Sequence, residues 1–134
     1  MNKLVIHTDC GEVIPLFLNM SLACDYRIVA THTIYQKSYF ELDMLPKGGV
    51  AFFLCKMLGN SKTRQLLESD KEMNAIEALD LGIVDQVVSI TILKKTAIQL
   101  APRLSNNPTR SLAGIKRLIN YSLKDLKEYL TFEN

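Results

Sequence analysis

The sequence contains few cysteines, and their arrangement suggests no covalent framework. Cys10, Cys24 and Cys55 are the three cysteines among 134 residues, an odd number without a paired spacing. Cys24 and Cys55 also lie within apolar patterns of helical spacing. We therefore expect reduced cysteines packed in the core of a cytoplasmic protein.

Long apolar runs are also lacking. No stretch approaches the roughly 18 apolar residues that a membrane-spanning helix needs. Residues 1–10 lack the basic and then apolar order of a signal peptide. These two absences predict a soluble protein in the cytoplasm.

An excess of charge of either sign is missing as well. The chain has 16 basic and 14 acidic residues, a net charge of +2, and the two signs are interspersed. This balance argues against binding to nucleic acid or to an anionic membrane. Most basic residues are expected on solvated helix faces. Two local groups, Lys94 with Lys95 and Arg110 with Lys116 and Arg117, leave open a contact with one phosphorylated small molecule.

The chain also lacks the signs of several domain classes. It has no internal repeat, low-complexity segment or linker rich in Pro, Gly or Ser. Gly48 and Gly49 precede a predicted helix, but no G-x-G-x-x-G or Walker pattern supports a nucleotide-binding domain. A hydrophobic content of 48% is sufficient for one buried core. We therefore expect a single globular unit.

Local patterns predict alternating strands and helices in the first part of the chain. A branched apolar run at 3–7 predicts a strand that ends in a turn at Gly11. Pro15 suits the first turn of a helix, and the residues after it are apolar on nearly every side, which indicates a buried helix. Two β-prone runs, 26–30 and 33–36, predict strands joined by a tight turn.

Helix signals dominate the rest of the chain. The pattern predicts a helix over 50–58 closed by Gly59, and another over 62–68 capped by Ser61. Asn74 is expected to cap a short helix that stops at Gly82 and is followed by a strand over 83–88. Three amphipathic helices complete the prediction, at 91–104, 108–120 and, capped by Ser122, 123–132. These elements predict an α/β core over 1–90 and a helical C-terminal region over 91–134.

Three blocks carry a family resemblance. They are L-A-C-D-Y-R-I at 22–28, L-P-K-G-G at 45–49 and A-I-E-A-L-D-L-G-I-V-D-Q-V-V at 75–88. Together they resemble the crotonase, or enoyl-CoA hydratase/isomerase, family, and the similarity extends over 3–130. The resemblance implies the C-terminal half of a spiral of β-β-α turns, followed by helices that pack into a homo-oligomer, either a trimer or a hexamer.

The resemblance also implies a chemistry. Members of the family are lyases and isomerases of fatty acid metabolism that bind an acyl-CoA thioester and stabilise an oxyanion with two backbone N–H groups. Coenzyme A is then part of the substrate, and no permanently bound cofactor is expected. Aligned without gaps, the Gly-rich turn of the family falls on Pro15, Leu16 and Phe17. The resemblance places Leu16, Phe17, Pro46 and Gly49 among the oxyanion and substrate-binding residues, although Leu16 and Phe17 are larger than glycine.

Both catalytic glutamates of the family are replaced. Asn19 stands at the first glutamate position and Tyr39 at the second. Asn19 cannot exchange a proton at neutral pH, and a phenol of pKa about 10 is a poor base. A shifted alignment with a two-residue gap would let Glu41 replace the second glutamate. Otherwise Asn19 satisfies buried backbone groups or a polar group of the substrate, and Tyr39 packs as an aromatic side chain.

Other polar residues have structural interpretations. Asp85 matches an acidic or polar position of the family and is expected to support a turn. His7, Asp9 and Cys10 resemble a metal cluster, but one short strand cannot aim all three at one ion, so no metal is expected.

The match also predicts that a part of the family pattern is missing. The strand pattern at 3–11 lies well inside the chain of other members, so we expect a truncated or split half that is completed by an N-terminal half or by an oligomer. Two functions remain open. One is an enzyme or binder of an acyl-CoA thioester that lacks standard hydration, and the other is a non-catalytic module for binding or assembly.

Overall fold

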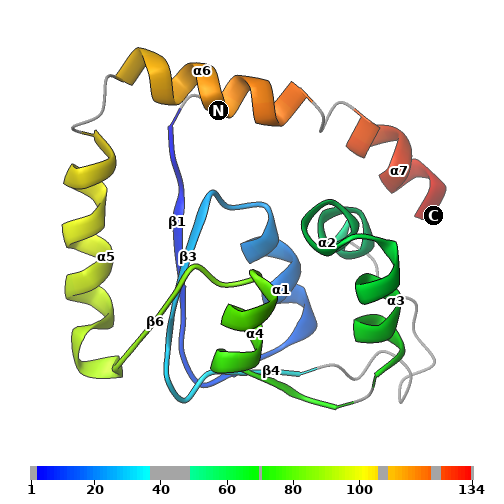
Figure 1. The fold of residues 1–134 in the computed structure, drawn as a ribbon, viewed down its shortest axis with the longest axis horizontal. Coiled ribbons are helices and arrows are strands. Elements are labelled where there is room, and N and C mark those ends of the chain that lie inside the picture. Colours follow the sequence, from blue (N-terminus) through cyan, green and yellow to red (C-terminus); the bar gives the residue numbers. More distant parts are fainter. Residues whose placement is uncertain (1–2, 37–48, 70, 106–108, 122–124, 134) are drawn as a thin grey trace.

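The computed structural model describes residues 3–36, 49–69, 71–105, 109–121 and 125–133. Its first sheet contains three parallel strands with β3 at the centre, in the order β1 (Ile6–Asp9), β3 (Tyr26–Ala30) and β6 (Gln86–Val88). Ile6 lies opposite Tyr26, and Ile28 lies opposite Gln86. The middle strand is therefore paired on both sides and forms the axis of the core (Figure 1).

A second small sheet lies at the end of these strands. Its order is β2 (Glu12–Val13), β4 (Ile34–Tyr35) and β5 (Met73–Asn74), with β2 parallel and β5 antiparallel to β4. The chain passes from the first sheet to the second once through Gly11, at φ +72°, and again after β3. The expected strands at 26–30 and 33–36 therefore exist, but they enter different sheets and do not pair with each other. Two consecutive strands, one in each sheet, followed by a helix form one β-β-α turn of a spiral.

Seven helices are described, and their bounds follow the sequence signals closely. They are α1 (Pro15–Leu22), α2 (Val50–Leu58), α3 (Asn60–Glu68), α4 (Ala75–Leu81), α5 (Ile90–Ser105), α6 (Thr109–Tyr121) and α7 (Leu126–Glu133). The first four lie around the sheets, whereas α5, α6 and α7 follow one another along the rim of the molecule (Figure 1).

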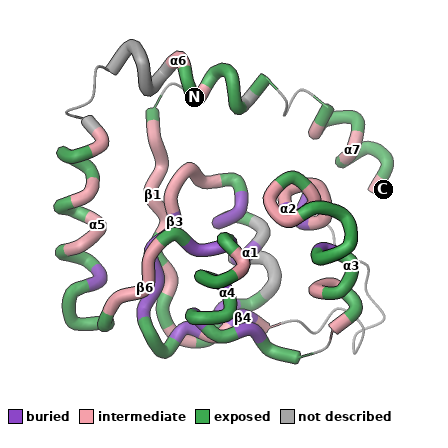
Figure 2. The backbone as a smooth tube through the Cα atoms, in the orientation of Figure 1, coloured by how far each residue is buried: buried purple, intermediate pink, exposed green. Residues whose placement is uncertain are grey.

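The main core lies among α1, α2, α4 and the second sheet. Tyr35, Val50 and Ile83 are completely buried in it, and Leu54 is 1% exposed. A smaller cluster, with Ile28 and Ala30 at its centre, packs the first sheet against α5 through Leu93. Figure 2 shows buried segments concentrated along the strands and exposed segments on the outer helices. The long helix α5 therefore shares a core with the first sheet.

Some element boundaries differ from the predictions for local reasons. The first strand is Ile6–Asp9 and not 3–7. The predicted strand over 83–88 is reduced to β6, because the N–H groups of Ile83 and Val84 donate to the carbonyl of Ala78 and close the turn after α4. Helix α3 begins at Asn60, so Ser61 is not its N-cap. The expected cap at Ser122 lies outside the described residues.

Two predicted caps are confirmed. The side-chain oxygen of Asn74 accepts a hydrogen bond of 2.9 Å from the N–H of Glu77 in the first turn of α4. Gly82 follows the same helix at φ +80°, a conformation that favours glycine. Both signals are local in sequence, which is why they identify the helix ends.

Among the described residues, each sheet has outer strands that pair on one side, and apolar side chains lie on the surface. Each sheet ends in a strand from the start of the described chain, β1 in the first and β2 in the second. On α6, Ile115 is 53%, Leu118 77% and Ile119 62% exposed. None of the helices that the structure describes combines the length and apolar character of a membrane span.

Candidate functional site

The N-terminus of α1 is the first part of the candidate site. Ile14 is extended, at φ −73° and ψ 157°, and Pro15 occupies the start of the helix as predicted. The N–H of Leu18 donates to the carbonyl of Ile14 at 3.3 Å. The N–H groups of Leu16 and Phe17 precede this hydrogen-bond ladder, at the positive end of the helix dipole. This end of α1 can donate to a carbonyl oxygen that gains negative charge.

The predicted catalytic residues are placed only in part. Asn19 lies in the second turn of α1, and its side chain, like those of Leu16 and Phe17, is outside what the structure describes. Tyr39, the alternative residue Glu41 and the substrate-binding candidate Pro46 also lie outside the described residues. At the predicted catalytic positions, the structure therefore describes only the backbone of α1.

Gly49 forms the second part of the candidate site. It precedes α2 at φ +82°, in the left-handed region that favours glycine. Its carbonyl accepts the N–H of Phe53 at 3.0 Å, and its N–H donates to Oε1 of Glu133 at 3.2 Å. The structure thus brings Gly49 to a helix N-terminus, as the sequence predicted, but a carboxylate of α7 already accepts its N–H.

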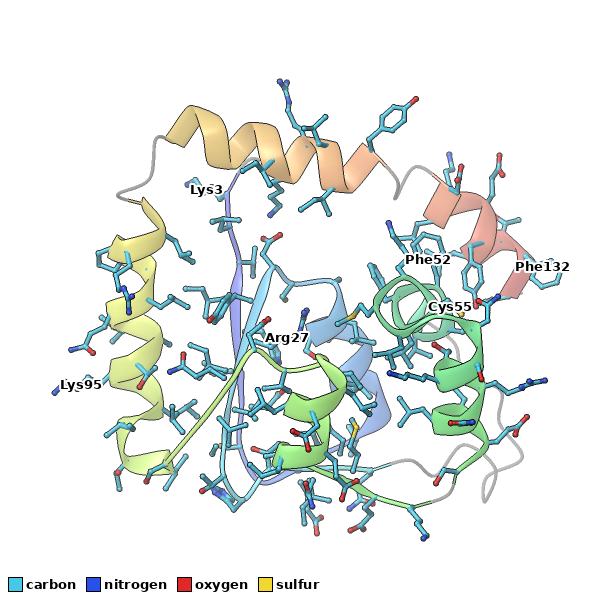
Figure 3. The ribbon with its side chains drawn as sticks, viewed as in Figure 1. Lys3, Arg27, Phe52, Cys55, Lys95 and Phe132 are labelled. Carbon is cyan, nitrogen blue, oxygen red and sulfur yellow. The ribbon has the colours of Figure 1, made fainter. Side chains whose placement is uncertain are left out.

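Arg27 holds the other end of α1, a role that the sequence analysis did not predict. Its guanidinium donates to the carbonyl of Ile83 at 2.5 Å and to those of Ser21 and Cys24 at 3.1 and 2.9 Å. Oδ2 of Asp85 accepts the backbone N–H of Arg27 at 2.9 Å, which supports a structural role for Asp85. Arg27 is 7% exposed and points into the space between β3 and α1 (Figure 3). It holds α1 in place from its C-terminal end.

A lysine from the C-terminal region is also used internally. Nζ of Lys116 on α6 lies 2.5 Å from Oδ2 of Asp25 and donates to the carbonyl of Lys3 as well. The same Asp25 oxygen accepts the N–H of Val5 at 2.8 Å. The pair attaches α6 to the start of the first sheet. Lys116 is therefore engaged with groups of the chain itself, whereas Lys95 points outward from α5 (Figure 3).

A polar network links the two sheets. The hydroxyl of Tyr35, which is fully buried, donates to Oδ2 of Asp9 at 3.0 Å, and Nε2 of His7 lies 2.9 Å from Oδ1 of the same carboxylate. Burial, and then the charge and hydrogen bond of Asp9, raise the pKa of Tyr35 well above its usual range. Within the described ranges, no group of three or more His, Cys, Asp or Glu side chains is arranged to hold a metal ion.

The cysteines are free but less buried than expected. Cys10 is exposed, and Cys24 and Cys55 are only half-buried, so the expectation of three core cysteines is wrong. The reason is positional, since Cys10 follows the last residue of β1 and Cys24 follows the end of α1. Partial burial raises the pKa of the Cys24 thiol, against the lowering effect of Arg27.

Replacing Tyr35 by phenylalanine should lower the free energy of unfolding by about 1–3 kcal/mol at neutral pH, because Asp9 loses a buried donor. The raised pKa of Tyr35 also predicts a dependence of stability on pH. The stability linked to the phenol is fully present below pH of about 10, the value for an unfolded tyrosine, and is lost as pH rises further. Urea unfolding at pH 7 to 11 measures both effects.

The control for this substitution is Tyr26→Phe, because Tyr26 is a partly buried tyrosine that packs against the smaller core cluster. We expect this variant to keep the neutral stability and the alkaline loss of the native protein. If Tyr35→Phe lost stability above pH of about 10 as steeply as the native protein, the alkaline loss would not belong to the Tyr35 phenol.

Sequence comparison relates the chain to one family over its whole length. A family model described as enoyl-CoA hydratase/isomerase matches residues 1–134. Carnitinyl-CoA dehydratase from Proteus mirabilis is 30% identical over 118 residues, which are 88% of this chain and 45% of the relative. Short-chain-enoyl-CoA hydratase from Clostridium acetobutylicum is 27% identical over 135 residues, 100% of this chain and 52% of the relative. The chain thus spans about half the length of the curated relatives it matches.

The fold has a solved counterpart. The crystal structure of enoyl-CoA hydratase from Bacillus halodurans matches with a TM-score of 0.90 at 25% identity, covering 98% of this chain and 53% of that chain. This likeness confirms the expected α/β class and its spiral of β-β-α turns, with about half of that chain represented.

Proposed function

Because this chain belongs to the enoyl-CoA hydratase/isomerase family, we propose that it binds an acyl-CoA thioester with the carbonyl oxygen at the N-terminus of α1. One observation carries the proposal: the helix starts at Pro15, so the N–H of Leu16 precedes the helical hydrogen bonds and needs an acceptor from outside the helix. A fixed donor at a positive helix end stabilises the enolate-like oxygen of a thioester. Coenzyme A is then part of the ligand and no resident cofactor is required.

The proposed chemistry stops at binding and carbonyl polarisation. Hydration of an enoyl thioester needs one group that removes a proton from water and one that delivers a proton to carbon. Asn19 and Tyr39 replace the two glutamates that do this in the family. Glu41 remains the alternative acid or base under the shifted alignment. We therefore propose an acyl-CoA binder without glutamate-dependent hydration.

The proposed site is completed from outside the described residues. A backbone donor on α1 accounts for one of the two N–H groups that the resemblance implies. Within the part of the chain that the structure describes, the edge strands β1 and β2 each pair on one side, and the matched relatives are about twice as long. We propose that an N-terminal half or a second copy of the chain covers these edges and supplies the second donor.

Calorimetric titration tests the ligand. We expect butyryl-CoA to release more heat and bind more tightly than free coenzyme A, because only the thioester carbonyl can accept the Leu16 N–H. Equal affinities would contradict carbonyl recognition. The titration is performed on the protein in its native assembly, with S-butyl-CoA, a thioether without the carbonyl, as the control.

The second candidate is an assembly module without ligand. The exposed apolar residues of α6 favour it, because large apolar surface commonly marks a contact with another chain. In this case neither butyryl-CoA nor coenzyme A would give heat, while light scattering would show an oligomer. A well-folded monomer at micromolar concentration would contradict the assembly role.

A further inference from the structure

The charged residues are unevenly distributed along the chain, although the net charge is only +2. Residues 86–124 contain no acidic residue, and all 14 acidic residues of the chain lie before or after this segment. The basic residues of the segment are Lys94, Lys95, Arg103, Arg110, Lys116, Arg117 and Lys124. Helices α5 and α6 lie within it. These two helices therefore carry an excess of positive charge that the balance of the whole chain does not reveal.

Helix α6 presents this charge next to apolar surface. Arg117 is exposed, Leu118 is 77% exposed and Tyr121 is 68% exposed. Residues three and four positions apart in a helix are neighbours, so these three side chains share one side of α6. We call them the basic face. Arginine and tyrosine beside an apolar side chain are typical of surfaces that bind another protein.

Helix α4 combines apolar side chains with the opposite charge. Its buried residues are Ala75 and Ala78. The acidic face of α4, as we call it, consists of the exposed residues Ile76, Glu77, Leu79 and Asp80. Among the described residues, no cation forms an ion pair with either of the two carboxylates. The acidic face therefore matches the basic face in charge, and both contain exposed apolar side chains.

The two faces lie at different ends of the molecule. Helix α6 is attached to the start of the first sheet, where Lys116 binds Asp25. Helix α4 follows β5 of the second sheet, which lies at the end of the strands of the first. Figure 1 shows α6 along the upper rim and α4 lower down, next to the second sheet. The faces can therefore meet only between two copies of the chain.

From this complementarity we propose that the acidic face of one copy binds the basic face of a second copy. An anionic membrane would match the basic face alone, whereas a second copy matches both faces. Because the two faces differ, the contact is head-to-tail, and it adds further copies in a ring or an open chain. The inference names the surfaces of a self-contact and does not depend on binding of an acyl-CoA thioester.

The size of the faces predicts a weak contact. Helix α4 has 7 residues, so it is only about 10 Å long. Stable protein interfaces bury about 1,200–2,000 Å² in total, and smaller ones are transient. Attraction between exposed charges is also screened by salt. We therefore expect an association that increases with protein concentration and is lost at high salt.

Sedimentation velocity of the whole protein, at about 50 mM and about 500 mM salt, tests the contact. We expect association at low salt, weakened at least about tenfold by Glu77→Gln with Asp80→Asn and by Arg117→Gln. The matched controls Glu68→Gln and Arg64→Gln, at exposed positions of α3, should associate like the native protein. Association that is independent of salt, or unchanged in the variants of the two faces, would overturn the proposal.

A mixture of the two variants tests the head-to-tail arrangement. Each variant keeps one intact face, so the mixture should form a complex of one copy of each, although neither variant associates alone. A mixture that stays as separate species would overturn the arrangement. Binding of the native protein to phosphatidylserine vesicles without self-association would assign the basic face to a membrane and overturn the second copy. Absence of binding heat with butyryl-CoA would contradict the proposed function and leave this contact unaffected.

Discussion

Replacing Arg27 by methionine is expected to lower the free energy of unfolding by about 3–5 kcal/mol, because a buried charged network loses its central member. Carbonyls of Ser21, Cys24 and Ile83 then lose a charged donor at once, and Asp85 loses its guanidinium neighbour. Domains of this size are stable by only about 5–15 kcal/mol, so the variant should be partly unfolded near 37 °C. Urea unfolding followed by circular dichroism measures the change.

The matched control is Arg64→Met, which replaces an exposed arginine of α3 by the same residue. Its free energy of unfolding should stay within about 0.5 kcal/mol of the native value. If Arg27→Met were as mild as this control, Arg27 would not be what holds the C-terminal end of α1.

Hydration of crotonyl-CoA is expected to be at least about 10⁴-fold slower than in the short-chain-enoyl-CoA hydratase from Clostridium acetobutylicum. Each positioned acid or base contributes about 10²–10⁴-fold. The ungapped family resemblance implies that Asn19 and Tyr39 stand at both positions. The loss of enoyl absorbance, recorded for the two proteins side by side, measures the rates.

A turnover rate within about tenfold of the rate of that relative would contradict the ungapped alignment, which places Asn19 and Tyr39 at the two glutamate positions. The variant Glu41→Gln then separates the two alignments. If it abolishes the turnover, Glu41 is the second carboxylate, whereas an unaffected rate excludes the shifted alignment. Glu68→Gln, at an exposed position of α3, is the control.

Elements encoded by neighbouring residues were predicted well. Pro15 identified the start of α1, and Asn74 and Gly82 identified both ends of α4, because a cap is formed by residues within one helical turn. Strand partners were not predicted from the sequence. The strands at 26–30 and 33–36 enter two different sheets, since their pairing depends on β1 and β2 more than ten residues away.

Long-range polar contacts explain the remaining differences. Arg27 reaches Ile83 across 56 positions, and Tyr35 reaches Asp9 across 26, so no local pattern reveals either contact. The sequence gives only a weak sign of the contact between Tyr35 and Asp9. The sign is that an acidic residue, Asp9, lies in a strand with apolar residues. For the candidate site, the family pattern predicted backbone positions in α1 and at Gly49, but not the Glu133 carboxylate.

The central claim is that a backbone donor at the start of α1 polarises a thioester carbonyl. The most direct measurement is the ¹³C NMR spectrum of butyryl-CoA labelled at its carbonyl carbon, free and bound to the protein in its native assembly. We predict a downfield shift of the bound carbonyl resonance, because hydrogen bonding at the positive end of α1 withdraws electron density from that carbon. A bound ligand with an unshifted carbonyl resonance would contradict the claim.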